Sequence, residues 1–326
     1  MENEDPFSEL NIPKIVKQKL AKKFSSLATL SRAPAQEISE QVGISLKLAK
    51  TSITSARTIL KQIPITAMDL LEEYKKKRKL TTGSQNLDEI LAGGISTGSI
   101  TEIIGEYASG KSQLTFQLCV NAQLPYELGG LEGSVYFIDT EGTFSAKRVF
   151  EIAYAKSQEN PDLIIPEKIL ENIHIGRAYN AEHQMNLIQE SDNFIVEKKI
   201  KLIIIDSIAA HFRTEYIGKD SLAARAQALM RHAAILYRFA DSYDLVVITT
   251  NQVLASVDKY IGGQGTEPAL GFAWGHRPQT RIFLRKQKGN ARIARIIDSP
   301  ELPESEAVFY ISNNGIEDKY SLDEDL

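Results

Sequence analysis

The chain has 326 residues, of which 43% are hydrophobic and 25% charged, and its formal net charge at pH 7 is −4. This length predicts one large domain, alone or with a small one, and the composition is typical of a globular chain with a sizeable core. The negative charge excludes nucleic-acid binding through overall charge, so any such binding needs a local basic surface.

The ends and the cysteine content indicate a soluble intracellular protein. Cys119 is the single cysteine, so no internal disulfide can form, and the acidic start MENEDPFSEL lacks the apolar core of a signal peptide. No run of 18 apolar residues occurs. We therefore expect no membrane partner.

The first 62 residues predict a small helical unit. Helix-like periodicity occurs at 10–24, 35–42 and 46–60. The turn at Val42-Gly43-Ile44 suggests a helix–hairpin–helix, a module that contacts duplex DNA, although a plain helical packing domain fits equally well. Residues 63–80, which include the charged stretch 72–79, are interpreted as a linker.

From residue 81 onward, apolar strands alternate with helical segments, a pattern typical of an α/β fold with a largely parallel sheet. Ligands of such sheets bind at the carboxyl ends of the strands. Strands are predicted at 99–104, 134–139, 173–176, 201–206, 245–250, 281–286 and 292–297, and helices at 111–124, 145–158, 181–198 and 221–242.

The first of these strands leads into a phosphate-binding loop pattern. The stretch IIGEYASGKSQLTFQL contains Gly105-x4-Gly110-Lys111-Ser112. Glycines let backbone N–H groups face phosphate oxygens, the lysine reaches the terminal phosphates, and the serine hydroxyl ligates Mg²⁺. The next helix directs its positive N-terminus at the same anion. A glycine-rich turn with a solvated lysine is the less favoured alternative.

Three other predicted strands end in polar side chains. Asp206 follows a buried strand, where it suits Mg²⁺ binding beside the loop serine or the capping of the next helix. Glu141 follows another strand, where a carboxylate can polarise an attacking water or face solvent in a turn. Gln252 follows a third, where an amide can sense a γ-phosphate or cap a turn.

Taken together, these motifs resemble the RecA-type recombinases, in particular archaeal RadA and its eukaryotic counterparts. The similar stretches are 105–112, 138–144, 203–207 and 250–252, with further phrases at 177–184, 211–216 and 298–303. The resemblance implies a RecA-like P-loop ATPase core over 81–326, preceded by a small helix-hairpin-helix domain at 1–62. Residues 63–80 would be a linker that carries an oligomerisation segment.

The resemblance also implies roles for individual residues. Lys111, Glu141 and Gln252 would act in ATP hydrolysis, with Mg²⁺ held by Ser112 and Asp206. ATP would be bound by Gly105, Glu106, Tyr107, Ala108, Ser109, Gly110, Lys111, Ser112 and Gln113, by Arg148 near the adenine, and by Asp298 and Pro303 of a neighbouring subunit. DNA would contact segments at about 213–225 and 253–275 through Arg213, Arg225, Phe272 and Trp274. Self-association would use Ile63, Ile65 and Ala67.

A basic stretch supports the DNA interpretation in part. Between Arg277 and Arg295 five further basic side chains occur and no acidic one: Arg281, Arg285, Lys286, Lys288 and Arg292. Such local charge suits phosphate contact, and nearby aromatic rings suit base stacking. A hairpin at Gly289-Asn290 whose charges protect a sheet edge explains the same residues equally well.

Several segments depart from the family pattern. Ala108 stands where the loop usually has a glycine, and 64–67 keeps the alanine of a Phe-x-x-Ala tether without its phenylalanine. The segment 268–275 lacks the usual pair of glycines and resembles recombinase paralogues.

We therefore predict a DNA-dependent ATPase that forms filaments or rings, binds single- and double-stranded DNA, and promotes homologous pairing and strand exchange in DNA repair, with ATP and Mg²⁺ as cofactors. The alternative is an ATP-binding paralogue that acts as a mediator without strand exchange. Recombinase paralogues or loaders are possible partners. The protein would be cytoplasmic and nucleoid-associated in an archaeon and nuclear in a eukaryote.

Overall fold

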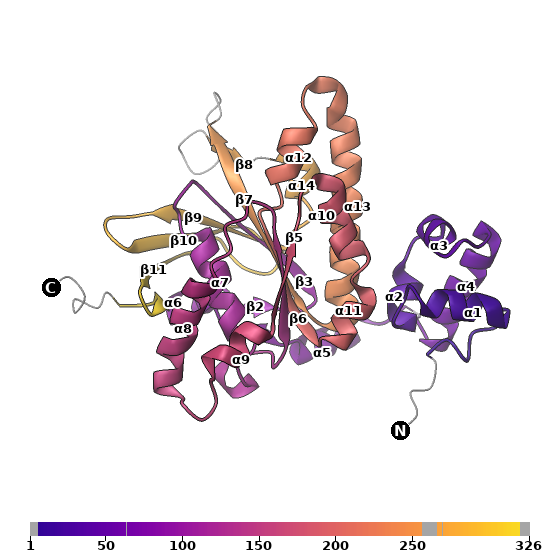
Figure 1. The fold of residues 1–326 in the computed structure, drawn as a ribbon, viewed down its shortest axis with the longest axis horizontal. Coiled ribbons are helices and arrows are strands. Elements are labelled where there is room, and N and C mark those ends of the chain that lie inside the picture. Colours follow the sequence, from indigo (N-terminus) through magenta and orange to yellow (C-terminus); the bar gives the residue numbers. More distant parts are fainter. Residues whose placement is uncertain (1–5, 63, 256–265, 269, 320–326) are drawn as a thin grey trace.

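The computed structural model describes residues 6–62, 64–255, 266–268 and 270–319. Figure 1 shows a small helical unit from the N-terminal part of the chain beside a larger unit, in which helices cover both faces of a central sheet. Among the described residues, no helix is both long and apolar enough to cross a membrane.

The small unit consists of four short helices around its own apolar core, which includes Phe7, Leu20 and Leu30. The helices are α1 (Lys14–Ala21), α2 (Leu27–Arg32), α3 (Ala35–Val42) and α4 (Leu46–Ile59). Gly43 ends α3 with a φ of +65°, a left-handed conformation that glycine adopts without steric cost. The sequence pattern predicted α1, α3 and α4 and missed α2.

Charged side chains join the small unit to the large one. Arg238, which is only 6% exposed, donates hydrogen bonds to both carboxylate oxygens of Glu37, at 2.8 and 3.2 Å. Nearby, Arg32 Nε lies 2.7 Å from Asp241 Oδ2. A bidentate pair of this kind fixes orientation as well as distance, so the two units have a defined mutual placement.

A short linker leads into the large unit. Helix α5 (Ala67–Lys76) begins with a capping box, in which Thr66 and Asp69 satisfy each other's backbone N–H groups. Strand β1 (Lys79–Leu80) then pairs with β2 (Ile95–Ser96) in a separate two-stranded sheet, with α6 (Gln85–Ile90) between them.

The central sheet has the strand order β12-β11-β10-β9-β3-β7-β6-β4-β5, and β8 pairs with β7. Strands β9, β3, β7, β6, β4 and β5 run parallel, whereas β10, β11 and β12 continue the sheet antiparallel. The bounds are β3 Ser99–Gly105, β4 Ser134–Asp139, β5 Ile173–Arg177, β6 Ile200–Asp206, β7 Val246–Ala255, β8 Thr266–Pro268, β9 Thr280–Lys286, β10 Ala291–Asp298, β11 Glu306–Ser312 and β12 Gly315–Glu317.

Helices cover the two faces of the sheet in two apolar layers. Successive strand residues alternate between them, so that Ile204 faces one layer while Ile203 and Ile205 face the other. One layer includes α7 (Lys111–Asn121), α8 (Ala146–Glu159) and α9 (Pro166–Glu171); the other includes α10 (Ala181–Gln189), α11 (Asp192–Glu197), α12 (Ala210–Glu215), α13 (Leu222–Tyr243) and α14 (Gly271–Gly275).

The predicted RecA-like α/β fold with a mostly parallel sheet is confirmed, and each of the seven predicted strands is present. The helix predicted at 181–198 is two helices, α10 and α11, which are separated at Glu190–Ser191. The outer strands β11 and β12 were not predicted.

Candidate active site

The carboxyl ends of four parallel strands meet at one edge of the sheet. Gly105 at the end of β3 is in register with Gln252 of β7, and Asp139 of β4 with Asp206 of β6. Because parallel strands end on the same side, the residues predicted for phosphate, metal and water contacts lie next to one another.

The loop after β3 has the strained, open backbone that phosphate binding requires. Gly110 has a φ of +101° and caps α7 without a side chain, so the first N–H groups of that helix remain available to an anion. Ala108 adopts a φ of +59°, which costs a non-glycine residue about 1–2 kcal/mol. At Gly105 a Cβ would lie 2.5 Å from Leu284 O, so a side chain is excluded there.

Lys111 folds back over this loop. Its Nζ donates hydrogen bonds to the carbonyl oxygens of Gly105 (2.9 Å) and Glu106 (2.8 Å). Burial lowers the pKa of Lys111, and the nearby carboxylates of Asp206 and Glu141 oppose that shift. The ammonium group is therefore held among acidic groups at the position from which a lysine can reach terminal phosphates.

Asp206 is a buried carboxylate, and one of its two oxygens has no hydrogen-bond partner among the described residues. Oδ1 accepts a hydrogen bond from Thr250 Oγ1, whereas Oδ2 is buried and makes no hydrogen bond among the described residues. Burial raises the pKa of Asp206, and Glu141 adds to this shift, whereas the hydroxyl groups of Thr250 and Ser112 and the charge of Lys111 reduce it. An unpaired buried oxygen close to Ser112 and Lys111 fits a divalent cation, since hard oxygen ligands are what Mg²⁺ prefers.

Glu141 lies on a turn that Asp139 organises. The Asp139 carboxylate accepts hydrogen bonds from the backbone N–H groups of residues 141 to 144, at 2.7 to 3.3 Å. Gly142 turns there with a φ of +72°, and a Cβ on it would meet the Arg177 guanidinium at 2.1 Å. The turn thus holds Glu141 beside the end of β6, where its Oε1 accepts from Ser207 Oγ at 2.8 Å.

Gln252 connects Glu141 to the first predicted DNA-facing segment. Its Nε2 donates to Glu141 Oε1 at 3.3 Å, and its Oε1 accepts from Arg213 Nη1 at 3.4 Å. Arg213 lies on α12 at the start of that segment. A single amide therefore contacts both the predicted water-positioning carboxylate and a predicted DNA-binding cation.

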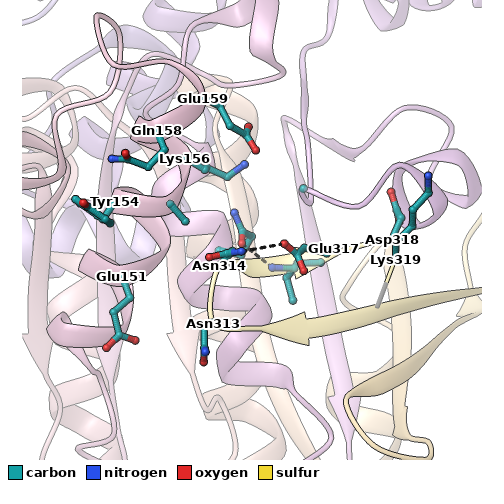
Figure 2. Close-up of a pocket in the computed structure, with 14 residues that line it drawn as sticks. Glu151, Tyr154, Lys156, Gln158, Glu159, Asn313, Asn314, Glu317, Asp318 and Lys319 are labelled. Atoms are coloured by element: carbon teal, nitrogen blue, oxygen red, sulfur yellow. Dashed lines mark hydrogen bonds between the residues drawn. The ribbon is translucent and has the colours of Figure 1, made fainter. Parts of the chain in front are cut away.

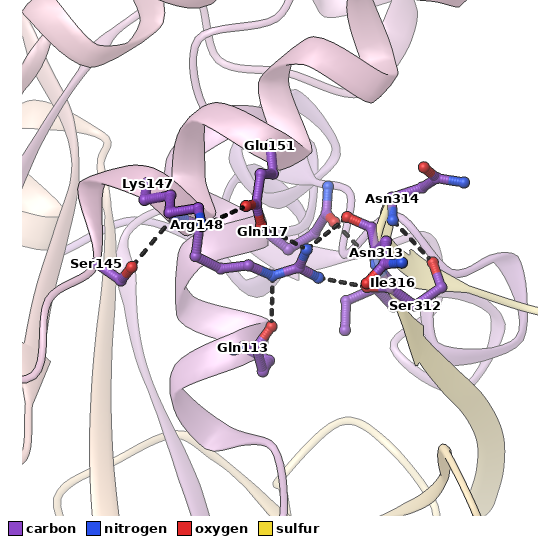
Figure 3. A network of polar contacts seen from close by, with 10 residues as sticks. All are labelled: Gln113, Gln117, Ser145, Lys147, Arg148, Glu151, Ser312, Asn313, Asn314 and Ile316. Carbon is purple, nitrogen blue, oxygen red and sulfur yellow. Dashed lines mark hydrogen bonds and ion pairs between the residues drawn. The ribbon is translucent and has the colours of Figure 1, made fainter. Parts of the chain in front are cut away.

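Arg148 on α8 is held by three elements (Figure 3). Its Nε donates to Gln113 Oε1 at 2.8 Å, and its two terminal nitrogens donate to the carbonyl oxygens of Ser312 and Asn313, each at 2.5 Å. The guanidinium plane is fixed beside the first turn of α7, so it can present a face to a flat ring bound next to the loop.

A cleft of about 1270 Å³ opens on the other side of this network, between α8 and the β11–β12 turn (Figure 2). Its lining includes the polar side chains of Gln117, Lys156, Asn314 and Glu317. None of the predicted phosphate- or metal-binding residues lines it, so it is a neighbour of the candidate site rather than part of it.

Asp298 and Pro303 lie away from the loop of their own chain. Both are exposed, and Asp298 is in register with Arg281, which pairs with Glu102 in the middle of β3 rather than with Gly105 at its end. Within one subunit the structure does not bring them to the phosphate loop, which is compatible with the expectation that they reach the nucleotide of a neighbour.

The predicted DNA contacts have mixed outcomes. Arg225 is partly exposed on the first turn of α13, and the side chain of Phe272 lies outside what the structure describes. Trp274 is 0% exposed and donates a hydrogen bond to Glu102, so the interpretation of its ring as a base-stacking platform is wrong for this conformation.

The basic stretch is also explained differently from expectation. Arg281 forms a buried ion pair with Glu102 at 2.8 Å, and Arg285 and Arg295 pair with acidic residues of the segment 304–306. Strands β9 and β10 are internal to the sheet, because β11 and β12 lie beyond them. The stretch therefore does not protect a sheet edge, and most of its described arginines have acidic partners within the chain.

The oligomerisation residues are partly described. Ile63 lies outside the described residues, Ile65 is 51% exposed, and Ala67 is an exposed residue at the start of α5. The apolar side chains of Met68, Leu70 and Leu71 on the same helix are exposed as well.

Sequence reasoning missed the residues that position the site. Asp139, the last residue of β4, organises the turn that carries Glu141, and Thr250, inside β7, donates a hydrogen bond to Asp206. Their closeness in sequence to the predicted site residues was the available signal. Glu102 was missed because nothing in an apolar strand indicates that a carboxylate has partners in distant segments.

A parallel sheet with a phosphate loop before a helix and a buried carboxylate beside the loop serine is the arrangement of a RecA-like P-loop core. The Rad51 family model matches residues 74–319. Two similar relatives carry the name "DNA repair and recombination protein RadA". That of Aeropyrum pernix is 41% identical over 295 residues, which cover 90% of each chain; that of Metallosphaera sedula is 43% identical over 296 residues, which cover 90% of this chain and 89% of the relative. The chain therefore belongs to the Rad51 family.

Proposed function

We propose that this protein is an ATP-dependent recombinase that assembles on single-stranded DNA and promotes homologous pairing and strand exchange in DNA repair. The names of its RadA relatives, over nine-tenths of the chain, support this reading. The alternative of a mediator without strand exchange has less support, since both relatives are named as recombination proteins and the chain has the phosphate loop, Asp206, Glu141 and Gln252.

The observation that carries the proposal is the double contact of Gln252, with Glu141 on one side and Arg213 on the other. DNA that draws Arg213 toward a phosphate would pull on this amide, and the amide touches the carboxylate that would position the attacking water. This arrangement supports ATP hydrolysis that depends on DNA.

ATP and Mg²⁺ fit the residues present. The loop 105–112 and the N-terminus of α7 would bind the phosphates, with Lys111 as the cation, and Arg148 would face the adenine. Ser112 and the unpaired Asp206 Oδ2 would hold Mg²⁺. When bound, the cation would neutralise charge on the phosphates; Glu141 would accept a hydrogen bond from the attacking water.

Self-association through the linker is a second part of the proposal. Strand β5 is the last strand of the sheet order, and its Ile175 is 44% exposed. We infer that the segment at Ile65, which precedes α5, adds to this edge in a neighbouring copy, with Ala67 at the start of α5 packed against it. An extended segment pairs readily with an open strand. Changing Ala67 to Glu would bury a charge in that contact and should reduce large assemblies to monomers in light scattering; assemblies that persist would show that another surface holds them.

The proposal is tested by strand exchange between a single-stranded circle and a homologous linear duplex, with ATP hydrolysis measured with and without single-stranded DNA. We expect joint molecules that require ATP, together with hydrolysis that rises on addition of DNA. Lys111→Ala is the control, because loss of the phosphate-binding cation should abolish both. ATP binding without joint molecules would favour the mediator.

A further inference from the structure

A buried polar cluster lies beneath the candidate site. Glu102 is 0% exposed and accepts three hydrogen bonds of 2.8 Å: from Asn251 Nδ2 and Trp274 Nε1 to its Oε1, and from Arg281 Nε to its Oε2. We call Glu102, Asn251, Trp274 and Arg281 the Glu102 cluster.

The cluster joins segments that are far apart in the sequence and different in role. Glu102 lies on β3, three residues before the first glycine of the phosphate loop. Asn251 lies on β7, directly before Gln252. Trp274 lies on α14, the described end of the second predicted DNA-facing segment. Through its hydrogen bonds, the Glu102 carboxylate of β3 thus connects β7 and α14, a strand of the candidate active site and a helix of a predicted DNA-facing segment.

The chemistry of the cluster exceeds what packing alone needs. A fully buried carboxylate is costly unless it is paired, and an apolar residue of similar size would fill the same space without that cost. Trp274 likewise belongs to a buried apolar layer, where a phenylalanine would be apolar and aromatic but could not bond Glu102. Directional bonds of this kind fix the relative position of the elements that carry them.

The cluster also has spare hydrogen-bonding groups. Asn251 Oδ1 and Arg281 Nη2 are buried and make no hydrogen bond among the described residues. The cluster therefore holds an acceptor and a donor that a second hydrogen-bonding arrangement could use. Coupling between two sites needs such an element with two arrangements.

We propose that Trp274 is a positioning residue, which transmits the nucleotide-bound state of β3 and β7 to α14 through Glu102, and so sets how strongly DNA stimulates ATP hydrolysis. This inference rests on the proposed function, and its failure can be told from the failure of that function.

The first test uses the unaltered protein, because Trp274 is its single tryptophan. Intrinsic tryptophan emission therefore reports on the Glu102 cluster alone. We expect poor quenching by acrylamide, because the indole is buried, and a change in emission when Mg²⁺ and a non-hydrolysable ATP analogue are added without DNA. An emission spectrum that does not respond to the nucleotide would overturn the inference.

The second test compares two variants by ATP hydrolysis with and without single-stranded DNA. Trp274→Phe keeps an aromatic ring and removes the N–H, so the stimulation by DNA should fall about fivefold or more, with hydrolysis in the absence of DNA near that of the unaltered protein. Phe239→Leu is the matched control: Phe239 is fully buried in the same apolar layer, so its loss should lower thermal stability without reducing the stimulation.

A double-mutant cycle with Glu102→Gln separates action through Glu102 from a general packing effect. If Trp274 acts through Glu102, the double variant should lose little more stimulation than either single variant. Fully additive losses, or equal losses in Trp274→Phe and Phe239→Leu, would overturn the inference while the proposed function stands. An unaltered protein whose ATP hydrolysis does not respond to DNA would contradict both.

Discussion

Two buried carboxylates, Glu102 on β3 and Asp206 on β6, sit in the same sheet and have opposite surroundings. Glu102 accepts hydrogen bonds from three donors, one of them a guanidinium. Asp206 has one hydroxyl donor on Oδ1, and its Oδ2 is unpaired among the described residues. Each side chain is 6% exposed or less, so burial alone does not distinguish them.

The difference shows how the same residue type becomes a structural link or a ligand site. A buried charge that is fully paired adds rigidity and has no capacity left for a ligand. A buried charge that is incompletely paired destabilises the free protein and is stabilised by a cation when one arrives. At the edge of the sheet where the ligand is expected, the buried carboxylate thus has fewer hydrogen-bond and ion-pair partners than in the Glu102 cluster.

The largest effect is expected at the candidate active site around Asp206, which we call the open site because its carboxylate is incompletely paired. The quantity affected is the rate of ATP hydrolysis. Glu141→Gln keeps the size and hydrogen bonding of the side chain but removes its charge and basicity. Turnover should fall by ~10²–10⁴-fold. Nucleotide affinity, measured by calorimetry, should change little, because Lys111, Ser112 and Asp206 are unaltered.

Such a variant should remain on DNA in the presence of ATP. Glu171→Gln, at the exposed end of α9, is the matched control and should hydrolyse ATP normally. Normal turnover in Glu141→Gln would show that Glu141 is only a turn residue and that the open site depends on another base.

The next largest effect is expected at the Glu102 cluster, where the carboxylate is fully paired. The quantity affected is the free energy of unfolding. Glu102→Ala leaves the Arg281 guanidinium, which is 11% exposed, without its partner. Breaking a buried pair in this way costs about 3–5 kcal/mol of the free energy of unfolding. Denaturant titration followed by circular dichroism measures the loss. A change under 1 kcal/mol would mean that the cluster is weakly coupled to the fold, and the contrast with Asp206 would fail.

A third buried group extends the comparison to pH. His232 on α13 is fully buried beside Phe212, and neither ring nitrogen has a partner among the described residues. Burial lowers the pKa of His232 to about 4. A lowered pKa means that the stability is complete above the ordinary value near 6.5 and is lost as the pH falls toward 4, by about 3 kcal/mol in all. His232→Leu should flatten this part of the stability profile; an unchanged profile would contradict the assignment.

The regular part of the fold was predictable because its signals are local. Strands β4 and β6 are mainly apolar, β3 mixes apolar with polar residues, and β7 is apolar at its start. Parallel pairing brings together the polar residues toward the carboxyl ends of these strands. The phosphate loop, Asp206, Glu141 and Gln252 could therefore be placed at one site from the sequence.

The rest depends on partners that no local pattern reveals. Trp274 was interpreted as exposed because aromatic and basic residues are its neighbours in sequence, yet its hydrogen-bond acceptor lies 172 residues away. Strands β11 and β12 were missed because β11 alternates weakly and β12 has three residues, so both depend on pairing with β10 and with each other.

The smallest effect is expected for Asp206→Asn, which should stabilise the protein, whereas Glu102→Ala should destabilise it. This difference in sign tests the contrast between the two carboxylates most directly. The folded protein raises the pKa of Asp206 above its ordinary value of 3.8, chiefly through burial. The folded state therefore binds this proton more tightly than the unfolded state does. The stability that the proton brings is complete below pH 3.8 and is lost as the pH rises through the raised pKa.

At neutral pH the charged carboxylate therefore lowers the stability of the folded protein, and Asp206→Asn should stabilise the nucleotide-free protein by about 1 kcal/mol. Thermal unfolding should show a melting temperature ~1–2 °C higher at pH 7 and no gain at pH 3. The added stability from Mg²⁺ and ATP should fall in the same variant, since the metal-binding oxygen is lost. If Asp206→Asn instead destabilises the nucleotide-free protein as Glu102→Ala does, the two carboxylates are both structural and the open site lies elsewhere.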